Sequence, residues 1–389
     1  MMIKDKAAIV GVGSSEYFKR GQSLPRTEHE LFCTAVLRAV DDAGISVDEI
    51  DGFACYCGGA SFDPGYVAQT IGLKELHFGA SVSGGANGAA GSVGLAATAV
   101  ATGQAKMVVS AISVQQAAAR MSAAYYEHAH SAEDDALGAA GVFSPGNMAA
   151  LVARRQMHKY GVTREHWAEI AISQRANAIR RPSSLQRAPL TRDDYFNARM
   201  LSDPLCLFDY GLESDGAVAI ITTSAERARD LRHPPVYITA SAIGGDGRWG
   251  RGISWMGMPD DIFSNGPAAP AARSLYSRAG VGPGDVDVAL FFDHFTPAVL
   301  AQLETYGFCG EGEGGDFVAD GHIRWPSGSI PVNTHGGNLS EAFISGLTHV
   351  REAVEQLRGT AVNQVNGAEI ALVGGTATSL PSSSIILRR

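Results

Sequence analysis

Hydrophobic residues along this chain gather in short runs that are apolar at almost every position. The clearest runs are Ala7–Val12, Met107–Ala111, Val236–Ala242 and Val288–Phe292. Strands covered by helices on both faces have this pattern, whereas a strand with one wet face alternates apolar and polar residues. Helical patterns separate the runs, and the order strand, helix, strand, helix, strand occurs twice. The chain is therefore predicted to be an α/β protein built from two βαβ halves.

A duplicated stretch supports this division. Leu37–Asp51 and Ala272–Asp287 each combine a predicted helix, an Ala-Gly stop and a short acidic turn, and each leads into an apolar run. Gly44 and Gly280 stand where the C-cap of a helix requires a positive φ. We expect both copies to fold as helix, turn and buried strand.

A second duplicated pair begins at two Gly-Gly turns. The turn at Ser83–Gly85 is expected to open an Ala- and Gly-rich helix that runs to Thr102. The turn at His335–Gly337 is expected to open a helix that runs to Leu357, followed by a strand over Glu369–Val373. Both helices are expected to end at a glycine before an apolar strand, so the repeat covers much of the chain.

The predicted domain boundaries divide the chain into residues 1–233 and 234–389, with an inserted loop domain over 114–203 in the first half. The insertion has helical patterns at Met148–Tyr160 and Arg164–Ala178. Two consecutive prolines at the junction of the halves prevent a helix from continuing across it.

The overall composition excludes two classes of partner. The 389 residues are 45% hydrophobic and 18% charged, with a formal net charge of -9. No Lys- or Arg-rich run stands out, so we expect no nucleic acid partner. No apolar run reaches the roughly 18 residues that a membrane helix needs, so we expect no membrane partner.

The cysteines are few and scattered, and their number is five, which is odd. Together with the lack of a signal-peptide pattern, this predicts reduced thiols and a cytoplasmic location. Cys55 and Cys57 are separated by only one residue and no second pair follows, so no metal site is expected.

Several motifs resemble those of the thiolases, and the resemblance covers essentially the whole chain. The motifs are Ala7–Gly13, Glu213–Ala219, Gly310–Gly314 and Pro331–Gly337. The resemblance implies the thiolase fold, a layered α/β/α/β/α structure. It is sharpest to the lipid-transfer-protein-like branch and, within it, to acyl-CoA aldolases that shorten steroid side chains. Those aldolases carry Tyr-Asp-His-Phe-Thr-Pro and Asn-Thr-His-Gly-Gly motifs, matched here by Phe292–Pro297 and Asn333–Gly337.

The chain departs from these relatives at the positions that carry their chemistry. The nucleophilic cysteine of thiolases falls on Gly85, and the histidine of their Gly-His-Pro motif falls on Phe343. The second thiolase cysteine falls near Leu372–Val373. The two active-site tyrosines of the aldolases fall on Phe292 and Phe343, where a phenyl ring fills the same space but exchanges no proton.

The match to the aldolases implies a catalytic group at the end of the predicted strand Val288–Phe292. His294 follows this strand, and ligands bind at strand ends in α/β sheets. We interpret His294 as a proton carrier and Asp293 as an orienting or structural carboxylate. The alternative for His294 is a structural histidine that bonds the aspartate or a carbonyl group.

The resemblance implies a second group of site residues on two glycine turns. His335 precedes a predicted helix N-terminus, where backbone amides and the imidazole would bind a developing oxyanion; the alternative is a histidine that caps the turn. The candidate substrate-binding residues are Gly84, Gly85, Phe292, Asn333, Gly336, Gly337 and Phe343. For Gly84 and Gly85 the alternative is close helix packing alone.

The expected function is carbon–carbon bond cleavage of the retro-aldol type on a β-hydroxyacyl-CoA, with a steroid side chain as a candidate acyl group. No cysteine nucleophile, resident cofactor or metal is expected, and the CoA thioester is the substrate. One alternative is a non-catalytic acyl-CoA-binding, lipid-binding or scaffold subunit. The other is an acyltransferase that uses Cys309, which we expect instead to pack as a small apolar residue.

Two protein partners are expected. A homodimer would cover the apolar run Met107–Ala111 if that run forms a sheet edge. The aldolase resemblance also implies a small OB-fold, zinc-ribbon partner protein, since no paired Cys-x-x-Cys motif occurs in this chain.

Overall fold

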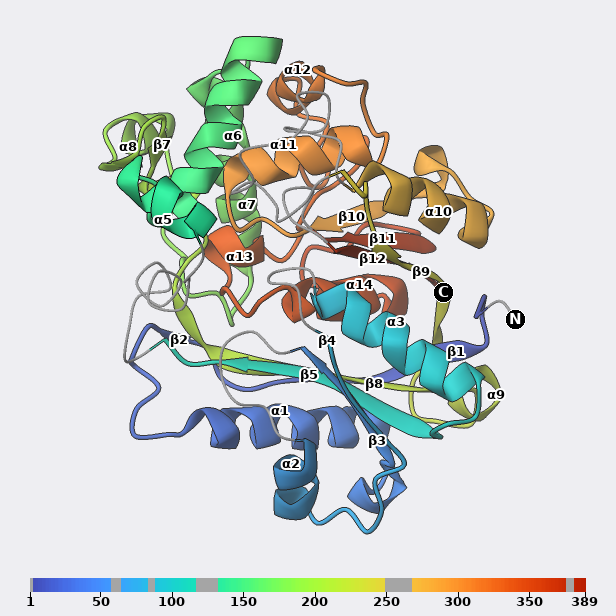
Figure 1. The fold of residues 1–389 in the computed structure, drawn as a ribbon. Coiled ribbons are helices and arrows are strands. Elements are labelled where there is room, and N and C mark those ends of the chain that lie inside the picture. Colours follow the sequence, from blue (N-terminus) through green and yellow to red (C-terminus); the bar gives the residue numbers. More distant parts are fainter. Residues whose placement is uncertain (1–2, 57–63, 83–87, 117–131, 249–267, 376–380) are drawn as a thin grey trace.

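Helices and strands of this chain stack in five layers (Figure 1). The computed structural model describes residues 3–56, 64–82, 88–116, 132–248, 268–375 and 381–389. Its strands are β1 (Ala7–Ser14), β2 (Phe18–Lys19), β3 (Gly52–Tyr56), β4 (Phe78–Val82), β5 (Met107–Val114), β6 (Met200–Ser202), β7 (Leu205–Cys206), β8 (Ser214–Ser224), β9 (Val236–Gly244), β10 (Val288–Phe291), β11 (Ile370–Gly374) and β12 (Ser382–Arg388).

The helices supply the other layers. They are α1 (Glu28–Ala43), α2 (Pro64–Ile71), α3 (Gly88–Ala101), α5 (Ala132–Ala139), α6 (Pro145–Tyr160), α7 (Arg164–Arg180), α8 (Arg192–Phe196), α9 (Ala225–Ala228), α10 (Ala269–Ala279), α11 (Thr296–Thr305), α12 (Gly314–Ala319), α13 (Gly337–Ser340) and α14 (Leu347–Arg358). Helix α1 covers one outer face, α3 and α14 form the middle layer, and α10 and α11 cover the other outer face (Figure 1). This is the predicted α/β/α/β/α arrangement.

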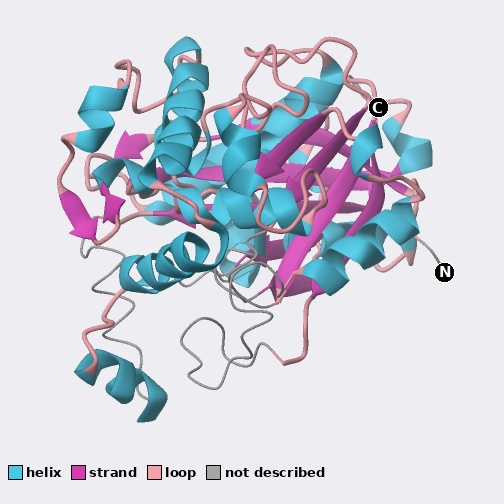
Figure 2. Cartoon of the chain, turned by 90° about the horizontal axis from the view of Figure 1, so that it is seen from above, coloured by secondary structure: helices cyan, strands magenta, loops and turns pink. Residues whose placement is uncertain are grey.

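The strands between these layers form one path in the order β10-β11-β12-β9-β1-β8-β5-β3-β4. The two halves meet where Ala8 pairs with Tyr237 and Ile9 pairs with Val236. In Figure 2 the long strands run side by side with helices packed around them. Because hydrogen bonds connect both halves through β1 and β9, the division at residues 233 and 234 stays a prediction.

Strand β5 is an interior strand, which corrects one expectation. It pairs with β3 on one side and with β8 on the other. Its continuous hydrophobic pattern therefore reflects helix layers on both faces, and the prediction that Met107–Ala111 forms an uncovered edge is wrong. The edge of this half is β4, whose residues alternate between half-buried and exposed.

Helix α3 shows why the middle layer is rich in alanine and glycine. It lies between strands of both halves, and eleven of its fourteen residues are buried. A Cβ atom at Gly94 would lie 2.0 Å from the hydroxyl oxygen of Ser241 on β9. Only small residues let the helix approach two sheet surfaces this closely.

The first predicted duplication is confirmed. Gly44 caps α1 with φ 70° and Gly280 caps α10 with φ 72°, and each cap is followed by a short 3₁₀ turn and then β3 or β10. The second duplication is only partly right, since the expected single helix from Gly337 to Leu357 is broken into α13 and α14. Gly346, with φ 90°, separates them as the N-cap of α14.

The predicted helices of the insertion are confirmed as α6 and α7. Backbone hydrogen bonds connect the segment between the insertion and β8 to the C-terminal half: the Gly211 amide donates to the His294 carbonyl and the Leu212 amide to the Asn338 carbonyl, both at 2.8 Å. Within the described ranges, no helix combines the length and apolar character that crossing a membrane requires.

Candidate active site

The end of β10 carries three consecutive residues of interest, Phe292, Asp293 and His294. Two buried amide side chains hold the backbone here. The Gln302 amide donates to the Phe292 carbonyl at 2.9 Å. The Asn333 amide donates to the Phe291 carbonyl at 2.9 Å, and its oxygen accepts from the Phe291 amide at 2.7 Å. Asn333, expected to bind substrate, thus acts as a support for the strand end.

Phe292 is the centre of an aromatic group that unites several predicted residues. Its ring centre lies 5.2 Å from that of His294 and 5.9 Å from that of Phe343. It also lies 6.2 Å from the ring of His349, with the two planes at 28°. The structure therefore brings together Phe292, His294 and Phe343 and adds His349, which the sequence analysis did not identify.

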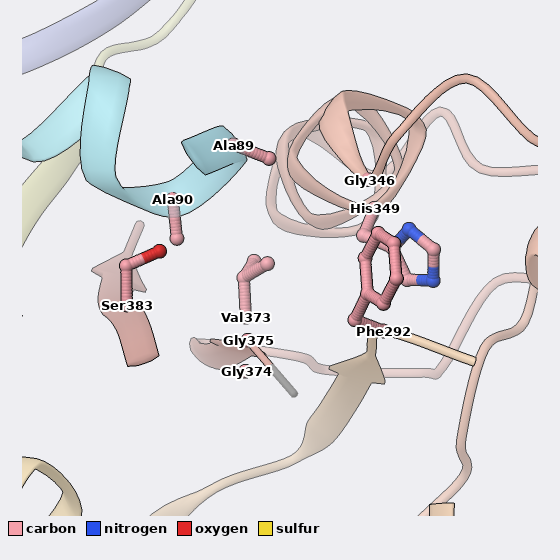
Figure 3. Close-up of a pocket in the computed structure, with 9 residues that line it drawn as sticks. All are labelled: Ala89, Ala90, Phe292, Gly346, His349, Val373, Gly374, Gly375 and Ser383. Atoms are coloured by element: carbon pink, nitrogen blue, oxygen red, sulfur yellow. The ribbon is translucent and has the colours of Figure 1, made fainter. Parts of the chain in front are cut away.

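A pocket opens beside Phe292 (Figure 3). It lies where the first turn of α3, the ends of β10 and β11, β12 and the first turn of α14 meet. Its enclosed space is about 10 Å³, roughly the room that one water-sized group needs. The described residues that line it are Ala89, Ala90, Phe292, Gly346, His349, Val373, Gly374, Gly375 and Ser383.

Asp293 orients His349 at the wall of this pocket. The carboxylate accepts from the backbone amides of Asn338 at 2.8 Å and Leu339 at 3.1 Å, at the start of α13. The same carboxylate lies 2.9 Å from Nε2 of His349. Asp293 is fully buried and His349 is 1% exposed. The orienting role predicted for Asp293 fits this geometry, although its histidine is His349.

Gly346 allows His349 to occupy this position. A Cβ atom at Gly346 would lie 2.8 Å from Cδ2 of Phe292, and the backbone has φ 90°. Glycine therefore lets α14 begin directly against the phenyl ring. The available sequence signal for His349 was the glycine just before the helix that carries it. The pairing of His349 with Asp293 spans 56 positions and has no local sequence pattern.

His294 is mostly buried beside the same phenyl ring. Burial lowers the pKa of His294 to about 4, although the neighbouring Asp293 carboxylate opposes this shift. The imidazole is therefore neutral at pH 7 and has an unprotonated ring nitrogen, and the lowered pKa makes it a weaker base than an ordinary histidine.

His335 lies behind His349 and does not line the pocket. Its ring centre is 4.7 Å from that of His349, and the side chain is fully buried. Burial, followed by the positive charges around it, lowers the pKa of His335 well below its usual value. Its predicted role as an oxyanion donor therefore requires a movement that would expose the ring.

Three backbone amides at and after the Gly336-Gly337 turn already donate to groups of the protein, and the expected oxyanion site at this turn stays a prediction. The Gly336 amide donates to the Asn333 carbonyl at 2.8 Å, and the next two helical amides, of Asn338 and Leu339, bind Asp293. Packing explains why position 337 is a glycine, because a Cβ atom there would lie 2.0 Å from Oδ2 of Asp293. Gly84 and Gly85 lie outside the described residues.

A buried ionic network supports the site from behind. The Arg181 guanidinium, at the end of α7, contacts Glu341 at 2.7 Å, Glu352 at 2.6 Å and Glu355 at 2.7 Å. Arg351 contacts Glu341 at 2.7 Å. The network joins the insertion to the segment between α13 and α14 that carries Phe343.

Cys309 has the properties of an unreactive thiol. It is half-buried, and burial, with the nearby carboxylates of Glu304 and Glu313, raises its pKa to about 12. A thiol needs its thiolate form for nucleophilic attack. Cys309 is also absent from the described lining of the pocket.

The layered fold and the strand-end pocket define a thiolase-like protein, and comparison with known proteins agrees. Residues 253–389 match the family model described as thiolase C-terminal domain-like. A steroid side-chain-cleaving aldolase of Thermomonospora curvata is 37% identical over 98% of this chain and 97% of its own length. A 17-hydroxy-3-oxo-4-pregnene-20-carboxyl-CoA lyase of Mycobacterium tuberculosis is 37% identical over 99% of this chain and its whole length.

A solved structure extends the likeness to three dimensions. The Ltp2-ChsH2(DUF35) aldolase superposes with a TM-score of 0.91 and 36% identity, over 100% of this chain and 99% of the compared one. The chain therefore belongs to the thiolase-like family of aldolases and acyl-CoA lyases. It is an enzyme, a carbon–carbon lyase of the retro-aldol type.

Proposed function

We propose that this lyase cleaves a β-hydroxyacyl-CoA whose acyl group is a steroid side chain, and that the reaction occurs at the Phe292 pocket. The names of the full-length relatives support the substrate class. The observation that carries the location is the neutral imidazole of His294, placed beside Phe292 at the end of β10.

The reaction needs a base for the β-hydroxyl group and a site for the thioester enolate. His294 accepts the hydroxyl proton as the Cα–Cβ bond breaks. The first amides of α3 have no partner within the helix and carry its positive dipole end, and Ala89 and Ala90 bring this turn to the pocket. We assign the enolate oxygen to these amides. No nucleophile is required, which agrees with Gly85 at the position of the thiolase cysteine.

A non-catalytic acyl-CoA-binding or scaffold role is the second candidate. It is favoured by the two phenyl rings of Phe292 and Phe343, 5.9 Å apart, at positions where the aldolases carry tyrosines. Tight acyl-CoA binding without turnover, unchanged in His294→Gln, would establish it. Acyltransfer through Cys309 has less support, given its raised pKa.

A homodimer remains part of the proposal, now through β4. Among the described strands β4 ends the sheet path, so one of its sides pairs with no other described strand. Pairing with the same strand of a second copy would cover this side. Light scattering should give twice the single-chain mass of 40.7 kDa, and a single-chain mass at micromolar concentration would contradict it.

A small OB-fold, zinc-ribbon protein is the other proposed partner. Support comes from the two components in the name of the Ltp2-ChsH2(DUF35) aldolase. A cytoplasmic location also belongs to the proposal, since Cys33, Cys206 and Cys309 are free thiols.

A panel of β-hydroxyacyl-CoA thioesters, with steroid side-chain members, tests the proposal on the chain purified with its native partner. We expect a carbonyl product from at least one member and a loss of at least about 100-fold in His294→Gln. The matched control is His322→Gln, which changes a histidine outside the pocket and should leave the rate unchanged. No carbonyl product from any member would refute the proposal.

A further inference from the structure

We propose that His349, oriented by Asp293, is a second proton carrier that delivers a proton to the α-carbon of the enolate. This inference rests on the proposed function, because the enolate arises only in that reaction. His294 is the base that removes the proton from the hydroxyl oxygen, and His349 would be the acid that protonates the α-carbon.

The contact with Asp293 occupies one of the two ring nitrogens of His349. Nε2 lies 2.9 Å from the Asp293 carboxylate, which is also held by the amides of Asn338 and Leu339. A carboxylate so placed accepts a hydrogen bond, so Nε2 carries the hydrogen in neutral His349. Nδ1 is then the basic nitrogen, with the Thr348 hydroxyl 3.3 Å away.

His349 is also the histidine among the described lining residues of the pocket. Its ring stands beside Phe292 at the pocket wall (Figure 3). The remaining lining residues apart from Ser383 are apolar or glycine, and these groups neither donate nor accept a proton. Of the described lining, the imidazole is therefore the side chain that can both donate and accept a proton at nitrogen.

The Phe292 ring contacts both imidazoles. Its centre lies 5.2 Å from that of His294 and 6.2 Å from that of His349. A phenyl ring relays no proton, so the two histidines can hold different protonation states in one site. Retro-aldol cleavage requires this difference, since one group must be basic while the other is acidic.

The proton and electron balance follows from these positions. His294 takes the β-hydroxyl proton, the oxygen electrons form the carbonyl group, and the Cα–Cβ electron pair moves into the thioester enolate. Protonated His349 then gives its Nδ1 proton to the α-carbon. The products are a carbonyl compound and a shorter acyl-CoA, and both histidines return to their starting states through exchange with water.

Hydrogen–deuterium exchange at carbon tests the role of His349 apart from cleavage. Acetyl-CoA is incubated with the enzyme and its partner in D₂O, and deuterium at the α-carbon is followed by mass spectrometry. We expect wild-type enzyme to exchange these protons and His349→Gln to lose at least about 100-fold of the rate. The glutamine amide can still donate to Asp293, which favours a folded variant.

Three further variants sharpen the test. His294→Gln should lose cleavage but retain exchange, because His294 acts on oxygen. Asp293→Asn should reduce exchange, since Asp293 is a positioning residue that acts through His349. If His349→Gln does not unfold cooperatively, Asp293→Asn takes its place in the test. His322→Gln, outside the pocket, should change nothing.

The outcomes separate the two proposals. Two results would overturn the inference and leave the proposed function intact. In the first, the wild type cleaves and His349→Gln exchanges as fast as the wild type. In the second, the wild type cleaves but does not exchange. If the wild type neither cleaves nor exchanges, both fall together. If the wild type exchanges but cleaves no panel member, the proposed function is refuted and the role of His349 as an acid–base group is retained.

Discussion

Gly337 leaves the space that the carboxylate of Asp293 occupies: a Cβ atom at Gly337 would lie 2.0 Å from Oδ2 of Asp293. The glycine also has φ 63°, a conformation that other residues adopt at a cost of about 1–2 kcal/mol. Through this contact the Gly-Gly turn fixes the residue that orients His349. The motif that resembles the aldolases therefore acts on the site through packing.

Gly337→Ala should destabilise the fold by more than its backbone conformation alone explains. We expect a loss of about 3 kcal/mol or more, since overpacking adds about 1–3 kcal/mol to the left-handed conformation. Urea unfolding measures it. The matched control is Gly359→Ala, with φ 77° and no atom within 4 Å, which should show only the conformational cost. Equal losses in both variants would contradict the close contact.

Much of the fold follows from local pattern, and the strand order does not. The helices α6 and α7 and the glycine caps of α1 and α10 are predictable because capping residues and periodicity lie within one stretch of chain. The same pattern placed β5 at an edge, since apolar faces reveal helix cover but not the neighbouring strands.

The candidate site divides in the same way. His294 and Phe292 were found because an aldolase motif includes them, and Phe343 because an aldolase tyrosine falls on it. The structure does gather these three residues. His349 was missed because its partner Asp293 is 56 residues away and no motif joins them. The oxyanion site at the turn stays a prediction, because the sequence does not reveal that Asp293 already accepts from the amides of Asn338 and Leu339, which follow the turn.

Stability should fall with acid because His294 is neutral in the fold. Its pKa of about 4 is below the ordinary 6.5, so between these values the unfolded chain binds a proton that the folded chain does not. The free energy of unfolding is therefore unaffected by this group above pH 6.5 and decreases as the pH falls toward 4, by about 3 kcal/mol in all. Urea midpoints should drop less between pH 7.5 and 4.5 in His294→Gln than in wild type. Identical pH slopes would contradict the low pKa.

Arg181→Met should lower the free energy of unfolding more than most single substitutions. The Arg181 side chain is 8% exposed and contacts Glu341 and Glu352, whose side chains are fully buried. Removing it leaves buried charge uncompensated, with an expected loss of about 3–5 kcal/mol. Lys74→Met is the control, since its pair with Asp48 is exposed and screened by solvent, so its loss should be much smaller. A loss as small as that of Lys74→Met would argue against the network.

Phe292→Tyr and Phe343→Tyr should raise lyase activity. Each variant restores a phenol group that the aldolases carry. Phe292 lines the pocket, and the ring of Phe343 lies 5.9 Å from it. We expect at least about tenfold higher kcat, toward the lower end of what a positioned acid–base group contributes. Phe317→Tyr, remote from the pocket, is the matched control. Loss of activity in both pocket variants would mean that the phenyl rings belong to a different chemistry.

Product stoichiometry tests the retro-aldol assignment most directly. A steroid side-chain β-hydroxyacyl-CoA is incubated with the chain and its native partner, and substrate, carbonyl product and shortened acyl-CoA are quantified together by mass spectrometry. The account predicts one carbonyl product and one shorter acyl-CoA for each substrate consumed. Consumption that yields free CoA without a carbonyl product, or tight binding with no consumption, would contradict it.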